Sequence, residues 1–275
     1  MTDLLLHSIS NFKEIISQIL DEICPKIIVE IGCEYAGSTF QFLEYCKKND
    51  AFLYIVDPSP FVDVQNVLKN YSEYYEFIEE KSLDALKKIK KADLYIVDGD
   101  HNYWTVINEL NLIFENNSPV VIIHDVGYPC SRRDLYYNPS NIPKEYLHNY
   151  TYDHGTNIKD ELILGGGFHG AGHFAFSIET NKEKMGVLTA IEDFMKYQPK
   201  LTYQSIPLIF GLGFIAHTNK FKIIEDFIKP YQIELMYEIE RNRMELYLKV
   251  LSLQSDLDEL RRSKLVRFIE KMGKK

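Results

Sequence analysis

Acidic and imidazole side chains gather in two short segments, each of which follows a run of apolar residues. The first segment reads Asp-Gly-Asp-His at 98–101 and the second reads His-Asp at 124–125. Carboxylates can bind a divalent cation, and an imidazole can accept a hydroxyl proton near neutral pH. In an open α/β sheet the carboxyl ends of the strands form the ligand crevice. We therefore expect four side chains to converge there: Asp98, His101, His124 and Asp125.

These four residues carry different expected roles. His101 is the candidate general base, and Asp98 and His124 are the other candidate catalytic residues. His124 has a competing interpretation as a supporting or metal-binding residue. A simpler alternative is that Asp98 and Asp125 only cap the following helices, because Asp is a favoured N-cap residue.

A second motif joins the apolar run at 27–31 to a segment of helical period, through Glu30-x-Gly32-x-x-x-Ala36-Gly37. Small residues there let the backbone approach a ligand, and a helix start offers unpaired N–H groups. The same pattern alone could be a tight turn. Asp57, however, ends the next apolar run, where an acid can accept hydrogen bonds from ribose hydroxyls. Together they indicate a nucleoside cofactor.

The charge of the turn narrows the choice of nucleoside. A dinucleotide site requires Gly-x-Gly-x-x-Gly around a pyrophosphate, whereas this chain has Glu34 at the second glycine position. A carboxylate there would repel a pyrophosphate. A buried acid such as Glu30 suits S-adenosylmethionine (SAM), whose sulfonium and amino groups are cationic.

The turn motif and Asp57 resemble the first motif and the ribose-binding acid of the class I SAM-dependent methyltransferases. That resemblance implies an α/β, Rossmann-like fold with a mostly parallel seven-stranded sheet. It also places Ser82 beside the adenine. The resulting candidate cofactor-binding residues are Glu30, Gly32, Ala36, Gly37, Ser38, Asp57, Ser82 and Asp98.

The Asp-Gly-Asp-His-x-Tyr and His-Asp segments resemble small-molecule O-methyltransferases, a family that includes sugar and antibiotic-tailoring enzymes and is related to the catechol O-methyltransferases. In metal-using members, acids at these two strand ends hold magnesium, and Asp98 and Asp125 match them. Val126 stands where relatives often have a further Asp or Asn, so one ligand of that pattern is missing.

Two further stretches, 132–137 and 186–194, resemble a subgroup of bacterial methyltransferases found in glycan contexts. In the first stretch, Arg133 and Tyr136 are candidates for contacting a polar substrate. Each has an alternative structural interpretation, a surface salt bridge for Arg133 and a packed ring for Tyr136.

Apolar runs alternate with segments of helical period, which is typical of a doubly wound α/β fold. We expect an amphipathic helix at 11–23, with Asn11 and Glu14 as a capping pair, and further helices at 82–90 and 187–197. The expected strands lie at 27–31, 52–56, 75–78, 94–97 and 120–123, followed by an antiparallel pair at 201–207 and 211–217.

The remaining segments extend this core. Residues 130–185 form a long insertion, irregular in character, which we interpret as a substrate lid. From residue 236, eight positions recur in steps of three and four, and all except Arg243 are apolar. This tail is either a coiled coil joining two copies or a long amphipathic helix lying on the core. We therefore expect a methyltransferase domain at 1–229 and a C-terminal helix at 230–275.

Composition limits the partners of this chain. The formal net charge is −9, which argues against a phosphate-binding surface and hence against nucleic acid. Four cysteines without a Cys-x-x-Cys pair fit a reducing, cytoplasmic setting. No apolar stretch approaches the roughly 20 residues that span a bilayer.

The sequence thus favours a SAM-dependent O-methyltransferase, with a sugar, a glycan or another small polar metabolite as acceptor and Mg²⁺ as an open question. An NAD-dependent oxidoreductase is the enzymatic alternative. A non-catalytic scaffold that binds partners through its tail is the other.

Overall fold

The protein is described by a computed structural model covering residues 7–115 and 117–262. Its centre is a seven-stranded sheet with the order β11-β12-β5-β4-β1-β2-β3. Strands β1 to β5 are parallel, and β12 runs antiparallel to both β5 and β11. The strands are β1 Ile27–Ile31, β2 Phe52–Val56, β3 Tyr75–Ile78, β4 Leu94–Val97, β5 Val120–His124, β11 Leu201–Ile206 and β12 Leu212–His217. This confirms the predicted fold class.

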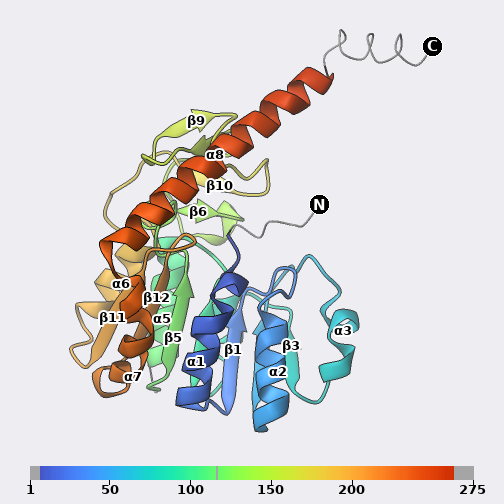
Figure 1. The fold of residues 1–275 in the computed structure, drawn as a ribbon, viewed down its shortest axis with the longest axis vertical. Helices are drawn as coiled ribbons and strands as arrows, with labels where there is room; N and C mark the ends of the chain where they lie inside the picture. Colours follow the sequence, from blue (N-terminus) through green and yellow to red (C-terminus); the bar gives the residue numbers. More distant parts are fainter. Residues whose placement is uncertain (1–6, 116, 263–275) are drawn as a thin grey trace.

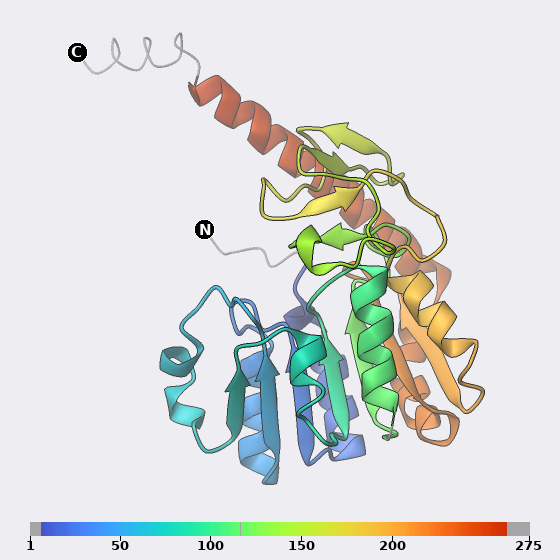
Figure 2. The same cartoon turned by 180° about the vertical axis from the view of Figure 1, so that it is seen from behind.

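Helices cover both faces of this sheet. One face carries α1 (Lys13–Ile23), α2 (Thr39–Asn49) and α7 (Thr218–Ile228) (Figure 1). The other face carries α4 (Ser82–Ala85), α5 (Tyr103–Phe114) and α6 (Val187–Met195) (Figure 2). The strands are therefore buried on both sides, and every residue of β4 and β5 is buried. Shorter helical elements are η1 Ile9–Phe12, α3 Val64–Val67, η2 Lys69–Tyr71, η3 Pro139–Asn141 and η4 Lys229–Tyr231.

The register of the parallel strands aligns their carboxyl ends. Ile31 at the end of β1 pairs with Val56 of β2 and with Val97 of β4, and Val97 pairs with Ile123 of β5. The residues that follow these strands therefore leave the sheet at one level. This alignment brings the two sequence motifs to one edge.

Two local predictions need correction. The helix expected at 82–90 ends as an α-helix at Ala85, because the chain continues as turns that still bury Leu86 and Ile89. The expected capping pair does not form either. A 3₁₀ turn precedes α1, and Ser8, rather than Asn11, accepts the capping hydrogen bond from the Ser10 N–H.

The insertion after β5 is more regular than its composition suggests. It forms a three-stranded antiparallel sheet, β6-β10-β7, and a two-stranded sheet, β8-β9, beyond the carboxyl edge of the main sheet (Figure 1). The sequence did not predict these short strands, and the role of the insertion as a substrate lid stays a prediction. The strands are β6 Leu135–Tyr136, β7 Tyr150–Thr151, β8 His154–Thr156, β9 Leu162–Leu164 and β10 Ala175–Ser177.

The tail is one helix, α8 (Glu234–Arg262), which runs along the insertion and projects past it (Figure 1). Its inner face packs on the protein: Glu240 accepts a hydrogen bond from the Phe210 N–H, and Met244 is buried. The last thirteen residues of the predicted tail, 263–275, lie outside the described part of the chain. Among the helices at 7–115 and 117–262, none is long and apolar enough to cross a membrane.

Candidate active site

The turn after β1 lies against the end of β4. Gly32 has a φ of +86°, and a Cβ on it would lie 2.1 Å from the carbonyl oxygen of Asp98. Only glycine fits this contact. Glu34 and Ala36 also adopt left-handed backbone conformations, with φ of 49° and 61°. The turn is thus a compact, constrained structure next to the strand that supplies Asp98.

Asp57 fixes the same turn from the end of β2. One carboxylate oxygen accepts hydrogen bonds from the N–H groups of Cys33, at 3.0 Å, and Glu34, at 3.1 Å. The other oxygen accepts from the Ser59 N–H at 2.9 Å. Because a carboxylate has about four acceptor sites, contact with ribose hydroxyls is compatible with this bracing. That ribose contact stays a prediction.

Glu30 and Ser38 lie behind the turn. Glu30 is fully buried, and its two oxygens accept hydrogen bonds from Ser38 Oγ, at 2.5 Å, and Thr39 Oγ1, at 2.7 Å. Burial raises the pKa of Glu30 to about 7, against the opposing effect of these hydrogen bonds. Both Glu30 oxygens thus join β1 to the start of α2, and contact of Glu30 with the cofactor stays a prediction.

Two other predicted cofactor residues lie at the same edge. Ser82 begins α4, shortly after β3. Gly37 lies in the turn before α2, where a Cβ would meet only Ser10 of η1, at 4.0 Å. The N-terminal η1 segment thus covers this part of the turn.

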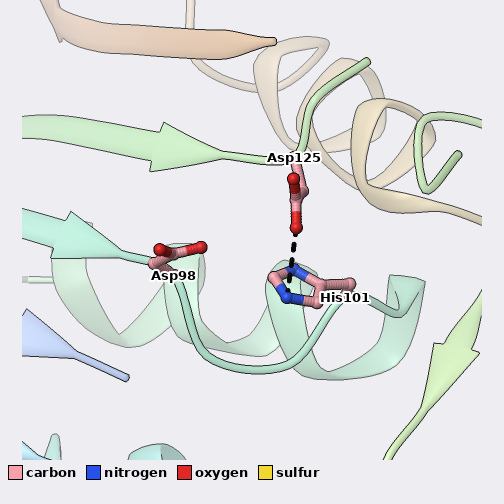
Figure 3. A group of neighbouring side chains, drawn as sticks. All are labelled: Asp98, His101 and Asp125. Carbon is pink, nitrogen blue, oxygen red and sulfur yellow. Dashed lines mark ion pairs between the residues drawn. The ribbon is translucent and has the colours of Figure 1, made fainter. Parts of the chain in front are cut away.

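The acid and histidine segments converge as predicted from their spacing. Single ligand atoms of Asp98, His101 and Asp125 all lie within 4.8 Å of one another (Figure 3). His101 Nε2 lies 3.2 Å from Asp125 Oδ2, and the His101 side chain is only 8% exposed. Asp98 keeps 20% of its side chain exposed. The cluster can therefore meet a ligand in the crevice while its base is held by a neighbouring carboxylate.

His124 lies beneath this cluster with both ring nitrogens engaged. Nδ1 lies 3.1 Å from Asp98 Oδ1 and 3.5 Å from Asp125 Oδ1, and Nε2 lies 2.8 Å from the carbonyl oxygen of Ile209. Burial alone would lower its pKa, but the charges of Asp125 and Asp98 and these hydrogen bonds raise it to about 9. A protonated ring donates from both nitrogens. This favours the supporting role for His124, and its catalytic and metal-binding roles stay predictions.

The two predicted substrate residues are in the interior of the insertion. Arg133 is 2% exposed, and its guanidinium pairs with Asp160 at 2.7 Å and donates to the carbonyl oxygens of residues 177–179. Tyr136 is 1% exposed and donates to Asp134 Oδ2 at 2.8 Å. The prediction that both contact a substrate is corrected: they stabilise the insertion.

The next residue, Tyr137, reaches the site instead. Its ring centroid lies 6.0 Å from that of His101, and Phe174 of the insertion lies 6.1 Å from Tyr137 in an edge-to-face arrangement. Tyr137 directly follows β6, so the alternation of side chains along a strand directs it away from the side taken by Tyr136. That alternation was the signal in the sequence that could have distinguished the two tyrosines.

The segment that carries this site matches a known protein family. Residues 29–126, from β1 to just past Asp125, match a family model described as a methyltransferase domain. This segment is therefore similar to a methyltransferase domain. The turn after β1 and the acid and histidine cluster both lie within the matched segment. No curated protein matches the sequence.

Solved methyltransferase structures show a looser similarity. A methyltransferase from Podospora anserina, bound to S-adenosylhomocysteine (SAH), is 14% identical, with 76% of this chain and 77% of that chain covered at a TM-score of 0.48. An O-methyltransferase from Bacillus cereus in complex with SAH is 11% identical, with 77% and 83% covered at a TM-score of 0.48.

Two glycines of the methyltransferase turn offer a matched pair of variants. We expect Gly32→Ala to lower the free energy of unfolding by at least about 2 kcal/mol and to abolish SAH binding, because the new Cβ meets the Asp98 carbonyl at an unfavourable φ. Gly37→Ala should keep the free energy of unfolding, since its Cβ has space. Urea unfolding and calorimetric titration with SAH measure the two effects, and equal behaviour of the variants would contradict this account of the turn.

Proposed function

We propose that the protein transfers a methyl group from SAM to a hydroxyl of a small polar molecule, with sugar and glycan hydroxyls among the candidate acceptors. The observation that carries this proposal is the pairing of His101 with Asp125, beside Asp98, within the matched domain. O-methylation needs a group that takes the hydroxyl proton, and the crevice presents a histidine held by a carboxylate.

The chain's own residues supply positioning and proton transfer. As the acceptor oxygen forms its bond to the methyl carbon, the bond from that carbon to sulfur breaks and SAH is released. The hydroxyl proton passes to His101 Nδ1, while Asp125 Oδ2, 3.2 Å from Nε2, orients the ring. His124 holds Asp98 and Asp125 in place beneath it. Alignment of two bound reactants supplies most of the gain in a direct transfer.

A divalent cation such as Mg²⁺ fits between the two acids. Asp125 Oδ1 is a buried oxygen with no hydrogen-bond partner among the described residues, and Asp98 lies beside it. Two carboxylate oxygens and an acceptor hydroxyl are ligands that Mg²⁺ prefers. When bound, the ion would lower the pKa of the acceptor hydroxyl. Asp98 and Asp125 are the residues we propose as its ligands.

The net charge bears on the kind of acceptor, and the cysteines bear on the cellular compartment. A net charge of −9 favours a small acceptor over nucleic acid. Cys24, Cys33, Cys46 and Cys130 are all free thiols, which fits a reducing compartment such as the cytoplasm.

His101→Gln tests the proposed base. We expect methyl transfer to an acceptor found by screening hydroxylated compounds to fall between about 100-fold and 10,000-fold, because glutamine cannot accept the proton. SAH affinity should stay within a few-fold, and His217→Gln, at the far end of β12, should behave as the wild type.

Chelation in the same assay addresses the metal. EDTA should slow the wild type and added Mg²⁺ should restore it. An unchanged rate in His101→Gln would remove the proposed base, and an EDTA-insensitive rate would remove the proposed cation.

We further propose that α8 joins two copies of the chain. The outer face of this helix exposes apolar side chains at coiled-coil spacing: Leu246, Val250, Leu253, Leu257 and Leu260 are each 46–65% exposed. Steps of four and three residues are the spacing of a coiled-coil seam, and the inner face of α8 is already covered by the insertion. A second α8 would cover the outer stripe with matching side chains.

Carboxylates placed on this exposed apolar face of α8 should separate the two copies of the chain. Leu253→Glu with Leu257→Glu is expected to halve the mass measured by light scattering, because the seam would bury repelling carboxylates. Ser252→Glu with Ser255→Glu adds the same charge to the same helix away from the stripe and should leave the mass unchanged. A wild-type protein of monomeric mass would contradict the dimer.

A further inference from the structure

An aromatic wall from the insertion stands beside the proposed base. Tyr137 contacts the His101 ring region at 6.0 Å between centroids, Phe174 lies 6.1 Å from Tyr137, and Phe168 lies 5.8 Å from Phe174. Phe168 continues the contact chain to Phe210, at 5.3 Å. This aromatic wall, made of Tyr137, Phe174 and Phe168, therefore packs on Phe210 at one end and reaches His101 at the other.

Tyr137 is half exposed, and its ring lies beside that of His101. The residue is 49% exposed, although it directly follows the fully enclosed Tyr136. Its hydroxyl nevertheless has a pKa well above the ordinary value, because of burial and of the charges of Asp125, Asp98 and Glu34. A half-exposed ring beside His101 can contact a bound acceptor.

The charges around this wall select the kind of acceptor. The carboxylates of Asp125, Asp98 and Glu34 act on the Tyr137 hydroxyl. Two described cations of this region already have partners: Arg133 is buried with Asp160, and Lys81 donates to Asn141 of the insertion at 2.7 Å. A phosphate or carboxylate on the acceptor would therefore meet the acids of the site.

We propose that Tyr137 and Phe174 bind the ring of a neutral, hydroxylated acceptor and hold one of its hydroxyl groups toward His101. This inference rests on the proposed function and names the acceptor chemistry of the same site. Tyr137 is then a specificity-determining residue supplied by the insertion, while the methyltransferase domain supplies the base.

Two kinds of ring share this chemistry. A phenolic ring packs on an aromatic wall through its face or edge, and a sugar ring packs through its C–H groups. Both present neighbouring hydroxyl groups to the cluster of Asp98, His101 and Asp125. Catechol and methyl β-D-glucopyranoside are small neutral probes that represent the two kinds.

The test measures probe binding to the SAH-loaded protein by saturation-transfer NMR and titration, so it does not depend on turnover. We expect at least one probe to bind, and Tyr137→Ala to weaken that binding by tenfold or more. Tyr137→Phe, which keeps the ring, should restore it to within about threefold. Tyr197→Ala removes a tyrosine that is 82% exposed and outside the wall, and it should change nothing.

The outcomes separate the two proposals. Catechol binding alone identifies an aromatic acceptor, and glucoside binding alone identifies a sugar. If neither probe binds the SAH-loaded protein, or if a probe binds wild type and Tyr137→Ala equally, the proposal that Tyr137 and Phe174 bind the acceptor ring is overturned. The methyltransferase proposal stays intact in both cases. Failure of SAH itself to bind overturns the proposed function.

Discussion

The site depends on one buried imidazole placed between two carboxylates. Asp98 and Asp125 end neighbouring parallel strands, so their carboxylates are close and repel each other when both are ionised. The His124 ring lies between them; against the effect of burial their charges raise its pKa, and the Ile209 carbonyl fixes the ring from the other side. With the two acids held in this way, Asp125 can also orient His101, and a buried oxygen remains available for a cation.

The same strand ends determine which cofactor the crevice can take. Gly32 brings the turn after β1 into contact with the Asp98 backbone, and Asp57 ties that turn to β2. The sheet then continues past β5 with β12, which is antiparallel, and β11. A dinucleotide-binding sheet of order 3-2-1-4-5-6 has no such strand inserted beside β5, and Glu34 occupies the turn where a pyrophosphate would need glycine. Both features disfavour the NAD-dependent oxidoreductase. The convergence of His101, Asp98 and Asp125 disfavours a scaffold without activity.

Strand ends were predictable because burial on both faces leaves continuous apolar runs. The central strands β1, β4 and β5 coincide with such runs to within one residue, and parallel pairing then fixes which side chains meet. The edge strands β3 and β11 are only partly buried, although their predicted bounds also agree to within one or two residues. The helix at 82–90 was overextended because Leu86 and Ile89 keep a helical burial period in a stretch of turns. The spacing of buried apolar residues alone does not distinguish a helix from a series of turns.

The insertion was much less predictable because its contacts are distant in sequence and its strands have two or three residues. Arg133 finds Asp160 and the carbonyls of 177–179 only after the chain folds back, so its burial leaves no local pattern. Tyr136 and Tyr137 are indistinguishable by type. Which of the two is buried depends on the pairing of β6 with β10, which places Tyr136 opposite Ala175.

Calorimetric titration of the purified protein with SAM, SAH and NAD⁺ tests whether this site binds SAM. We expect micromolar binding of SAM and SAH with one site per chain, and no measurable binding of NAD⁺. Binding of NAD⁺ without SAM, or of none of the three, would contradict it.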